Sequence, residues 1–346
     1  MYQIVEIECG ENRKSQIAVG QVINDINSFL PKDVRVIVIT DRNIHRLYGD
    51  LINSYEHILI GLGETIKTLQ TAEQIWRELL EMGADRKTFL LGIGGGIVTD
   101  ITGFIASTYM RGLRFGFVST SLLGQVDASV GGKDGVNLDG YKNIIGCFNQ
   151  PEFVLCDLDM LQTLPVREVR AGISEIVKGG VLGRSELFEL FEKHSYEQIV
   201  GNNELLLEAV MGAVKLKADV VESDERESGR RKLLNLGHTI AHAVEKCSSD
   251  FLHGEAVAIG MATIADISVK EGLLNSDDAQ RIKKAIENMG LPLTSGIDNH
   301  RLYKALLSDK KKETNHLDLI LIKSIGEAVI VPYTLDKLEA LICNQS

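Results

Sequence analysis

The chain has 346 residues, of which 44% are hydrophobic and 25% charged, so it has enough apolar side chains for two globular domains. Its formal net charge of -11 argues against a general affinity for nucleic acid, because a phosphate backbone needs a basic surface opposite it. The first residues do not resemble a signal peptide, no apolar run is long enough for a membrane span, and the five cysteines are scattered. We therefore expect a cytoplasmic protein with reduced thiols and no membrane partner.

The first half of the chain alternates strand patterns with helical ones. Short β-branched or apolar runs predict strands at residues 34–39, 57–61 and 88–93. Residues 71–83, between the last two runs, carry apolar side chains at helical spacing and end at Gly83, a typical C-cap residue. A strand, a helix and a strand in this order predict a parallel sheet with a right-handed crossover.

A glycine triplet at residues 94–96 follows the third expected strand. Glycines between a strand and a helix let the backbone approach a pyrophosphate, and the helix N-terminus supplies amide donors. The triplet departs from the usual G-x-G-x-x-G pattern, so a tight structural turn is the alternative. For a bound dinucleotide, the candidate ribose partners are Asp41, at the end of the first strand, and Glu64 with Lys67.

Glycines and polar side chains gather in the next stretch, residues 109–143. Its cationic and amide side chains include Arg111, Lys133, Lys142 and Asn143. Such side chains beside glycines suit the capture of an oxyanion such as phosphate, since they combine backbone access with charge-assisted donors. Each residue alone is more typical of a solvated loop, and their concentration is what favours a phosphate site.

The pattern changes after residue 163. β-branched runs largely disappear, and longer amphipathic segments follow at residues 169–178, 204–222 and 279–289. We therefore expect an α/β domain with a parallel, Rossmann-like sheet over residues 1–163 and a mostly α-helical domain over residues 164–346, with the ligand cleft between them. In the first helical segment, Glu175 and Lys178 share one face at i, i+3, a spacing that by itself usually marks a surface ion pair.

Three of the eight histidines lie close together in the second half of the chain. His238 and His242 are spaced i, i+4 in residues 233–244, whose apolar rhythm is helical, so both imidazoles project from one face. His253 follows shortly before a helix that is expected to begin at Glu255. Two or three neutral imidazoles favour a divalent metal, with a solvated histidine pair as the alternative.

Several of these segments, in this order, carry a resemblance to a known family. They are residues 94–100, 109–112, 125–133, 142–143, 174–178, 217–231 and 235–261. Together they resemble the 3-dehydroquinate synthases of the shikimate pathway, which belong to the sugar-phosphate cyclases. The resemblance implies that the substrate is a small sugar phosphate, that the cofactors are NAD and zinc or cobalt, and that the chain forms a homodimer.

The implied reaction converts 3-deoxy-D-arabino-heptulosonate 7-phosphate to 3-dehydroquinate and phosphate. NAD oxidises the substrate transiently, phosphate leaves by β-elimination, the hydride returns, and an intramolecular aldol addition closes the carbocycle. Because NAD ends in the state in which it began, no net oxidation occurs.

The resemblance also implies residue roles. The metal ligands match Glu175, His238 and His253. His242, which spacing alone would make a further ligand, matches instead a catalytic residue that faces the substrate and its phosphate. The other catalytic matches are Lys133, Lys178, Asp127 and Asn143. Substrate contacts match Arg111, Lys142, Lys217, Arg231, Asn235 and one of Lys310 and Lys311. Beside Asp41, the NAD site matches Glu64, Lys67, Gly94, Gly95, Gly96, Asp100, Thr120, Ser121, Lys133 and Lys142.

Three alternatives remain open. A sister cyclase would take a sugar phosphate without a carboxylate, which Arg231 and Lys217 argue against, because two cations buried without an anion are costly. A metal-dependent dehydrogenase of the glycerol dehydrogenase type would not use the phosphate-binding residues. A non-enzymatic NAD-binding protein would not need every candidate ligand and cation. Departures from the usual family residues at Ser119, Gly179, Arg230 and Ala241 leave room for a shifted substrate preference.

Overall fold

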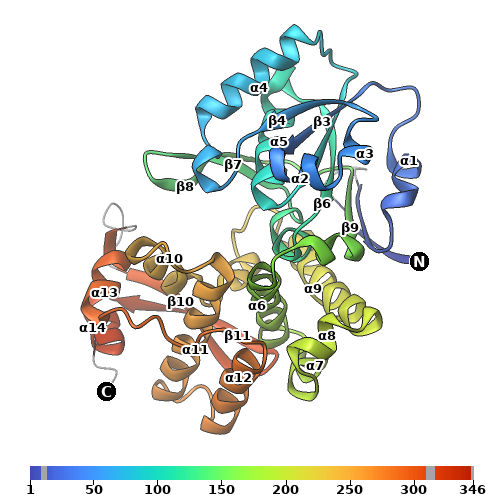
Figure 1. The fold of residues 1–346 in the computed structure, drawn as a ribbon. Helices are drawn as coiled ribbons and strands as arrows, with labels where there is room; N and C mark the ends of the chain where they lie inside the picture. The colour runs from blue at the N-terminus through green and yellow to red at the C-terminus, as the bar shows by residue number, and fades with distance from the viewer. Residues whose placement is uncertain (9–13, 309–315, 344–346) are drawn as a thin grey trace. The chain divides into compact units, whose positions relative to one another are not determined.

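The structure is a computed structural model that describes residues 1–8, 14–308 and 316–343. The chain forms two compact units (Figure 1). The first unit contains Met1–Pro165 and Lys217–Arg226, and the second contains Val166–Leu216 and Glu227–Ser346.

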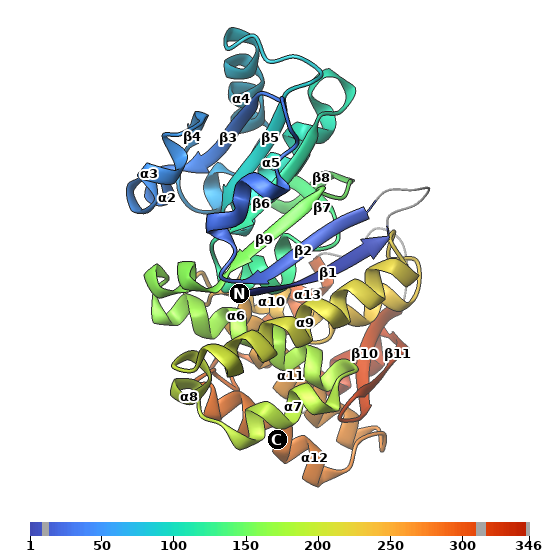
Figure 2. The ribbon, with the colours of Figure 1, turned by 90° about the vertical axis from the view of Figure 1, so that its right-hand side faces the viewer.

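The first unit is an α/β structure. The strands of its main sheet are β1 (Tyr2–Glu8), β2 (Lys14–Gly20), β3 (Val36–Asp41), β4 (Glu56–Ile60), β5 (Phe89–Gly94), β6 (Arg114–Ser119) and β9 (Phe153–Asp157). They follow the order β1-β2-β9-β6-β5-β3-β4, as Figure 2 shows. β1 is antiparallel to β2, and the other neighbouring pairs are parallel. The helices are α1 (Ile26–Phe29), α2 (Arg42–Leu47), α3 (Gly49–Ile52), α4 (Leu69–Glu81) and α5 (Gly96–Thr108).

The three predicted strands are β3, β4 and β5, and the predicted helix is α4, so the α/β class with a parallel sheet is confirmed. β5 shows how both faces of the sheet are covered. Its residues Phe89, Leu91 and Ile93 point to one face and join a buried apolar core. On the other face, a Cβ at Gly92 would lie 2.9 Å from Thr102 Oγ1 of α5, so the glycine lets this helix approach the sheet closely.

The second unit is mostly helical, as expected. Its helices are α6 (Val166–Leu182), α7 (Ser185–Lys193), α8 (Tyr196–Val200), the first part of α9 (Asn203–Ser223), α10 (His238–Cys247), α11 (His253–Lys270), α12 (Ser276–Asn288), α13 (Asn299–Ser308) and α14 (Leu335–Cys343). α11 packs against α6, α10 and α12, which explains why it is buried along most of its length.

Two hairpins lie where the sequence predicted no strands. In the first unit, β7 (Lys133–Leu138) pairs with β8 (Tyr141–Phe148), within the stretch expected to be polar loops. In the second unit, β10 (His316–Ser324) pairs with β11 (Glu327–Thr334), so this unit is not purely helical. β7 packs on α5 and β10 on α11, and such long-range packing leaves little local signal in the sequence.

The histidine-rich region also differs from its prediction in detail. The expected helix over residues 233–244 is interrupted, because Gly237 has φ 78° and α10 begins only at His238. The preceding residues, Arg230–Asn235, form a 3-10 helix. The helix expected to begin at Glu255 begins two residues earlier, at His253.

The second part of α9 belongs to the first unit. Lys217 Nζ donates to the backbone oxygen of Asp127 at 2.5 Å and also pairs with the Asp127 carboxylate. Glu222 Oε1 accepts a hydrogen bond of 2.8 Å from the backbone nitrogen of Glu8. These contacts attach one end of the helix to the α/β unit.

The described residues bear on the membrane and on the cysteines. Within them, no helix combines the length and the apolar character that crossing a membrane requires. The described cysteines are free thiols, namely Cys147, Cys156, Cys247 and Cys343, which agrees with the scattered pattern of cysteines in the sequence.

Candidate functional site

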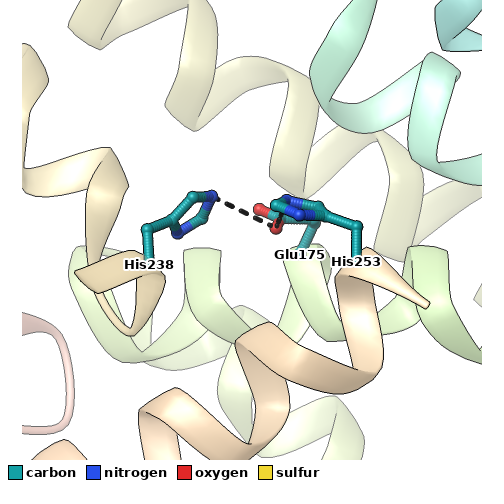
Figure 3. Close-up of side chains that lie close together, drawn as sticks. All are labelled: Glu175, His238 and His253. Carbon is teal, nitrogen blue, oxygen red and sulfur yellow. Dashed lines mark ion pairs between the residues drawn. The ribbon is translucent and has the colours of Figure 1, made fainter. Parts of the chain in front are cut away.

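Three side chains from three helices of the second unit meet at one point (Figure 3). Glu175 lies in α6, His238 begins α10, and His253 begins α11. The Nε2 atoms of both histidines lie 3.8 Å from Glu175 Oε1, and all the candidate ligand atoms lie within 4.8 Å of one another. Ligands of a tetrahedral zinc ion are about 3.4 Å apart, because each bond is about 2 Å long. Small side-chain movements would therefore complete a metal centre.

Glycines allow α11 to bring these ligands together. A Cβ on Gly254 would lie 1.9 Å from the backbone oxygen of Ala171 in α6. A Cβ on Gly260 would lie 2.1 Å from the backbone oxygen of Gly237, the N-cap of α10. Gly237 has a positive φ, which favours glycine. Close backbone contacts therefore fix the start of α11 against α6 and the start of α10 against α11.

The second ring nitrogen of each candidate histidine ligand has its own partner. His238 Nδ1 lies 3.1 Å from the backbone oxygen of Leu236, and His253 Nδ1 lies 3.3 Å from Glu245 Oε1. A carbonyl and a carboxylate can only accept, so both Nδ1 atoms donate. The Nε2 lone pairs are then directed at Glu175, and the rings are held in the tautomer that metal ligation requires.

The Glu175 carboxylate is suited to a cation. The residue is 4% exposed, and its Oε1 accepts no hydrogen bond from the described residues. Its Oε2 forms the predicted ion pair with Lys178, but the pair is buried, so the interpretation as a surface ion pair is wrong. The Lys178 ammonium offsets only part of the cost of burying this carboxylate, because Oε1 has no hydrogen-bond partner among these residues. A divalent ion between the carboxylate and two imidazoles would offset the remainder, and this donor set fits zinc or cobalt.

We expect Glu245→Gln to weaken metal binding about 10- to 100-fold, the usual effect of removing a hydrogen-bond partner of a metal-ligating histidine. The amide is a poorer acceptor than the carboxylate, so it holds the His253 Nδ1 proton less firmly. Zinc affinity measured by competition with a chelator tests this. Glu287→Gln, the same charge change at an exposed position of α12, is the control and should bind zinc like the wild type. Equal affinities for both variants would contradict this role of Glu245.

His242 lies one turn after His238 on α10, and the two rings meet edge to face with centroids 5.8 Å apart. His242 is exposed and does not belong to the group around Glu175. The i, i+4 spacing alone would have made it a metal ligand, and the structure does not group it with the other candidate ligands. A second group of possible donors, His300, Glu339 and Cys343, is not buried. Such groups are common at surfaces without an ion, and we assign this one no role.

The glycine triplet forms the predicted turn between a strand and a helix in the first unit. Gly94 ends β5, Gly95 is the N-cap of α5, and Gly96 is its first residue. The next strand end lies beside this turn, because the backbone nitrogen of Thr120 donates to the backbone oxygen of Gly94 at 2.9 Å. Ser121 Oγ accepts from the backbone nitrogen of Gly124 at 3.2 Å. The N-terminal amides of α5 are thus positioned as the phosphate-binding interpretation requires.

Lys67 and Asp100, both predicted for the NAD site, form an ion pair in the first unit. Their side chains are 5% and 10% exposed, so the pair is buried. Burial raises the pKa of Asp100 to about 6, although the Lys67 ammonium acts in the opposite direction. The Asp100 carboxylate therefore lies one turn after the start of α5, next to the glycine triplet.

Two further candidate dinucleotide contacts, Asp41 and Glu64, form hydrogen bonds within the fold. Asp41 ends β3 as predicted, and its Oδ1 caps α2 by accepting from Asn43 and Ile44 backbone nitrogens at 2.8 and 2.9 Å. Glu64 Oε1 accepts from Asn137 Nδ2 at 2.8 Å. This bond attaches the turn before α4 to the β7–β8 hairpin.

The residues of the predicted phosphate site lie on the β7–β8 hairpin and near the end of α5. Lys133 and Lys142 are exposed at the first part of each hairpin strand. Asn143 has φ 52° and donates its backbone N–H to Asn137 Oδ1 at 2.8 Å. Arg111 is exposed with φ 69°, directly before Gly112. Left-handed backbone at non-glycine residues is uncommon and often marks functional sites.

The candidate substrate-binding residues differ in their surroundings. Arg231 is 1% exposed, which is unusual for a guanidinium. Asn235 lies in the same 3-10 helix and donates to Glu227 Oε1 at 2.5 Å. Lys217 is bonded to Asp127, another predicted site residue, in the first unit. The predicted Lys310 and Lys311 lie outside the described residues.

Sequence reasoning did not single out two polar residues that hold predicted site residues in place. Asn137 links Glu64 to Asn143, and Glu245 holds His253. Glu245 lies seven positions after His238, so it shares that helix face, and a search for acids near the histidines would have found it. Asn137 gives no comparable signal.

The sequence matches two adjacent family models. The 3-dehydroquinate synthase N-terminal model covers residues 57–171, and the 3-dehydroquinate synthase C-terminal model covers residues 172–312. The 3-dehydroquinate synthase of Leptospira interrogans is 40% identical over 308 residues, which is 87% of this chain and 85% of the relative. That of Acinetobacter baylyi is 37% identical over 362 residues and covers 99% of both chains.

Solved structures share the fold. A 2-deoxy-scyllo-inosose synthase complexed with carbaglucose-6-phosphate, NAD+ and Co2+ has a TM-score of 0.87, 25% identity and 99% coverage of both chains. The 2-epi-5-epi-valiolone synthase of Streptomyces hygroscopicus, with NAD+ and Zn2+ bound, has a TM-score of 0.86, 27% identity and 97% coverage of both. A probable glycerol dehydrogenase of Sinorhizobium meliloti, with a TM-score of 0.66, 16% identity and 94% coverage of both, shares the fold alone.

The two family models together span most of the chain, and the curated relatives match it across most of both lengths. The chain therefore belongs to the 3-dehydroquinate synthase family.

Proposed function

We propose that the protein is a 3-dehydroquinate synthase, a carbocycle-forming phosphorus-oxygen lyase. It converts 3-deoxy-D-arabino-heptulosonate 7-phosphate to 3-dehydroquinate and phosphate. The observation that carries this proposal is the buried group of Glu175, His238 and His253, in a chain 40% identical to a relative of that name. The reaction ends with NAD unchanged, and its place is in aromatic amino-acid biosynthesis.

NAD and a divalent metal are the cofactors. When bound, the metal acidifies a substrate hydroxyl and polarises a carbonyl, while NAD takes up a hydride and returns it. We assign NAD to the first unit, at the turn of Gly94–Gly96 with Lys67 and Asp100, and the metal to Glu175, His238 and His253 of the second unit. The N-terminal amides of α5 favour the pyrophosphate through the helix dipole.

The phosphate of the substrate requires cationic and hydrogen-bonding partners as it leaves. We assign Lys133, Arg111 and Asn143 to this group, with Lys142 beside NAD and His242 facing the phosphate. Charge-assisted hydrogen bonds from lysine and arginine are about twice as strong as neutral ones, and they strengthen as negative charge develops on the leaving oxygen. The exposure of these side chains leaves them accessible to a ligand.

The carboxylate and hydroxyls of the substrate need separate partners. We assign the carboxylate to Arg231 and Lys217, with further substrate contacts from Asn235. Asp127 and Lys178 would hold hydroxyls. Lys178 already pairs with Glu175, so it can orient a hydroxyl next to the metal ligand, and Lys217 orients Asp127 by a direct hydrogen bond.

Among related activities, the identities favour the synthase. The relatives named 3-dehydroquinate synthase are 37% to 41% identical, whereas the inosose and valiolone synthases are 25% and 27% identical. Buried Arg231 also suits a substrate with a carboxylate. The glycerol dehydrogenase type shares only the fold.

The test is phosphate release from 3-deoxy-D-arabino-heptulosonate 7-phosphate with NAD and zinc or cobalt, while NADH absorbance is followed in the same cuvette. We expect release that requires both cofactors, without accumulation of NADH. Release only from glucose 6-phosphate or sedoheptulose 7-phosphate would assign a sister cyclase activity instead. Net formation of NADH would assign a dehydrogenase.

We further propose that the protein is a homodimer in the cytoplasm. Apolar side chains exposed on the β7–β8 hairpin support self-association, and they are Leu138, Tyr141, Ile144 and Phe148, between 39% and 60% exposed. The free thiols support a reducing compartment. Light scattering should give twice the chain mass of 38.1 kDa.

A further inference from the structure

A buried acid that no step above uses lies next to the NAD-site pair. Asp134 is the second residue of β7 and is 5% exposed. Its Oδ2 is fully buried and has no hydrogen-bond partner among the described residues. The preceding Lys133 is exposed, as expected when successive strand residues face opposite sides. A buried carboxyl oxygen without a hydrogen-bond partner requires an explanation.

The Asp134 carboxyl group is packed directly on α5. A Cβ on Gly103 would lie 2.1 Å from Asp134 Cγ, so only glycine leaves space for this carboxyl group. Asp100 precedes Gly103 by three residues and lies on the same face of α5. Its partner is the buried Lys67. Two carboxyl groups and one ammonium group thus share one buried region.

A charge count indicates which acid carries a proton. With one ammonium group, only one of the two carboxylates can be ionised without leaving a net buried charge. Lys67 pairs directly with Asp100, so Asp134 is the neutral acid. Burial and the nearby negative charge of Asp100 raise the pKa of Asp134 well above its usual range, against a smaller opposite effect of Lys67.

We propose that Asp134 is a positioning residue for NAD. A neutral Asp134 does not compete for Lys67, so Lys67 pairs with Asp100 alone. This pair keeps the Asp100 carboxylate fixed behind the glycine turn. This role rests on the proposed function, because NAD is the ligand concerned. Asp134 acts through Lys67 and Asp100, and we assign it no contact with the substrate.

The other charged groups near Asp134 are few. β8 contributes Cys147, whose pKa burial raises, with a smaller contribution from Asp134. The charged residues of α4, which also packs on β7, are exposed. Lys133, on β7 itself, is exposed on the opposite side of the strand. Glu64 and Asp127 act on Asp100, where both raise the pKa. Ionisation of Asp134 would therefore add an uncompensated charge.

The sign of the pH effect follows from this charge. A carboxyl group with a raised pKa is neutral at low pH and ionises as the pH rises through that pKa. A second carboxylate then competes for Lys67 and adds negative charge close to the pyrophosphate of NAD. NAD affinity should fall as the pH rises. The Asp134→Asn side chain has the same shape and no titratable proton, so this variant reproduces the neutral form at every pH.

The experiment measures the NAD dissociation constant of the zinc-loaded full chain by calorimetry from pH 7, where Asp100 is mostly ionised, to pH 9.5. The variants are Asp134→Asn and, as a control, Asp139→Asn, an exposed acid of the same hairpin. The wild type and Asp139→Asn should lose affinity by about tenfold per pH unit above the pKa of Asp134, the limit set by linkage to one proton. Asp134→Asn should bind NAD like the wild type at pH 7, and its NAD affinity should change less than twofold up to pH 9.5.

Thermal unfolding of the ligand-free protein gives a second reading. Because the folded-state pKa of Asp134 is above its unfolded value, its contribution to stability is lost as the pH rises from about 4. Asp134→Asn should therefore unfold at a higher temperature than the wild type, by a margin that widens with pH. If the wild type and Asp134→Asn have parallel pH profiles in NAD affinity and in unfolding, the role of Asp134 is overturned and the proposed function is not affected. A wild type that binds no NAD at any pH would overturn the proposed function as well.

Discussion

Glu175→Gln is expected to abolish stable metal binding and to slow phosphate release by about 10³-fold, since a catalytic metal contributes several kcal/mol and each 1.36 kcal/mol is a factor of ten. Glutamine keeps the volume of the side chain but replaces an anionic ligand by a neutral amide. It also leaves the buried Lys178 without its carboxylate. The measurement is zinc content per chain after dialysis, together with the rate of phosphate release.

The control is Glu189→Gln, which removes an exposed carboxylate paired with Lys193 on α7. Exposed pairs of this kind contribute about 0.3–0.5 kcal/mol, so this variant should keep its zinc and its activity. Circular dichroism separates loss of metal from loss of fold. A folded Glu175→Gln protein that retains one zinc ion and the wild-type rate would remove Glu175 from the metal centre.

Gly254→Ala is expected to destabilise the second unit by about 3 kcal/mol, at the upper end of typical overpacking effects. The added methyl group would lie 1.9 Å from the backbone oxygen of Ala171 and 2.7 Å from its Cα. Backbone atoms cannot rotate away as a side chain can, so α11 must shift from α6. Because His253 precedes this glycine, and Glu175 lies in α6, zinc affinity should fall together with stability. Urea unfolding and zinc titration measure the two effects.

Gly272→Ala is the matched control in the same unit. Gly272 has φ 70°, and nothing lies within 4 Å of a Cβ built there. Its substitution should cost about 1–2 kcal/mol, the penalty of left-handed backbone for an L-residue, and should leave zinc affinity unchanged. Equal zinc affinities for Gly254→Ala and the wild type would contradict the packing argument for His253.

The local elements of the first unit were largely predictable. β3, β5 and α4 have strong local patterns, because strands buried on both faces read as apolar runs and an amphipathic helix repeats its apolar residues every three or four positions. The turn at Gly94 to Gly96 was predictable for the same reason, since it lies between two strongly patterned elements. The β7–β8 and β10–β11 hairpins were missed, because their pairing depends on contacts with α5 and α11.

The residue types of the candidate metal centre were predictable, but their geometry was not. Histidine spacing pointed to His238 and His242 equally, and the structure groups only His238 with Glu175 and His253. His238 begins α10, directly after the close backbone contact between Gly237 and α11, whereas His242 lies one turn farther along the helix and is exposed. A contact between distant segments leaves no period in the sequence.

By itself, the sequence determined the α/β class of the first unit, the glycine turn, the helical character of the second unit and, through its resemblance, the family and the candidate ligands. These depend on residue type and on neighbours within a few positions. Only the tertiary structure decided that the pair of Glu175 and Lys178 is buried, that Lys217 pairs with Asp127, and that Asp134 lies against α5 beside Asp100. Burial and charge pairing arise from segments far apart in the chain, and the free energy of a charge depends on those surroundings more than on its own residue type.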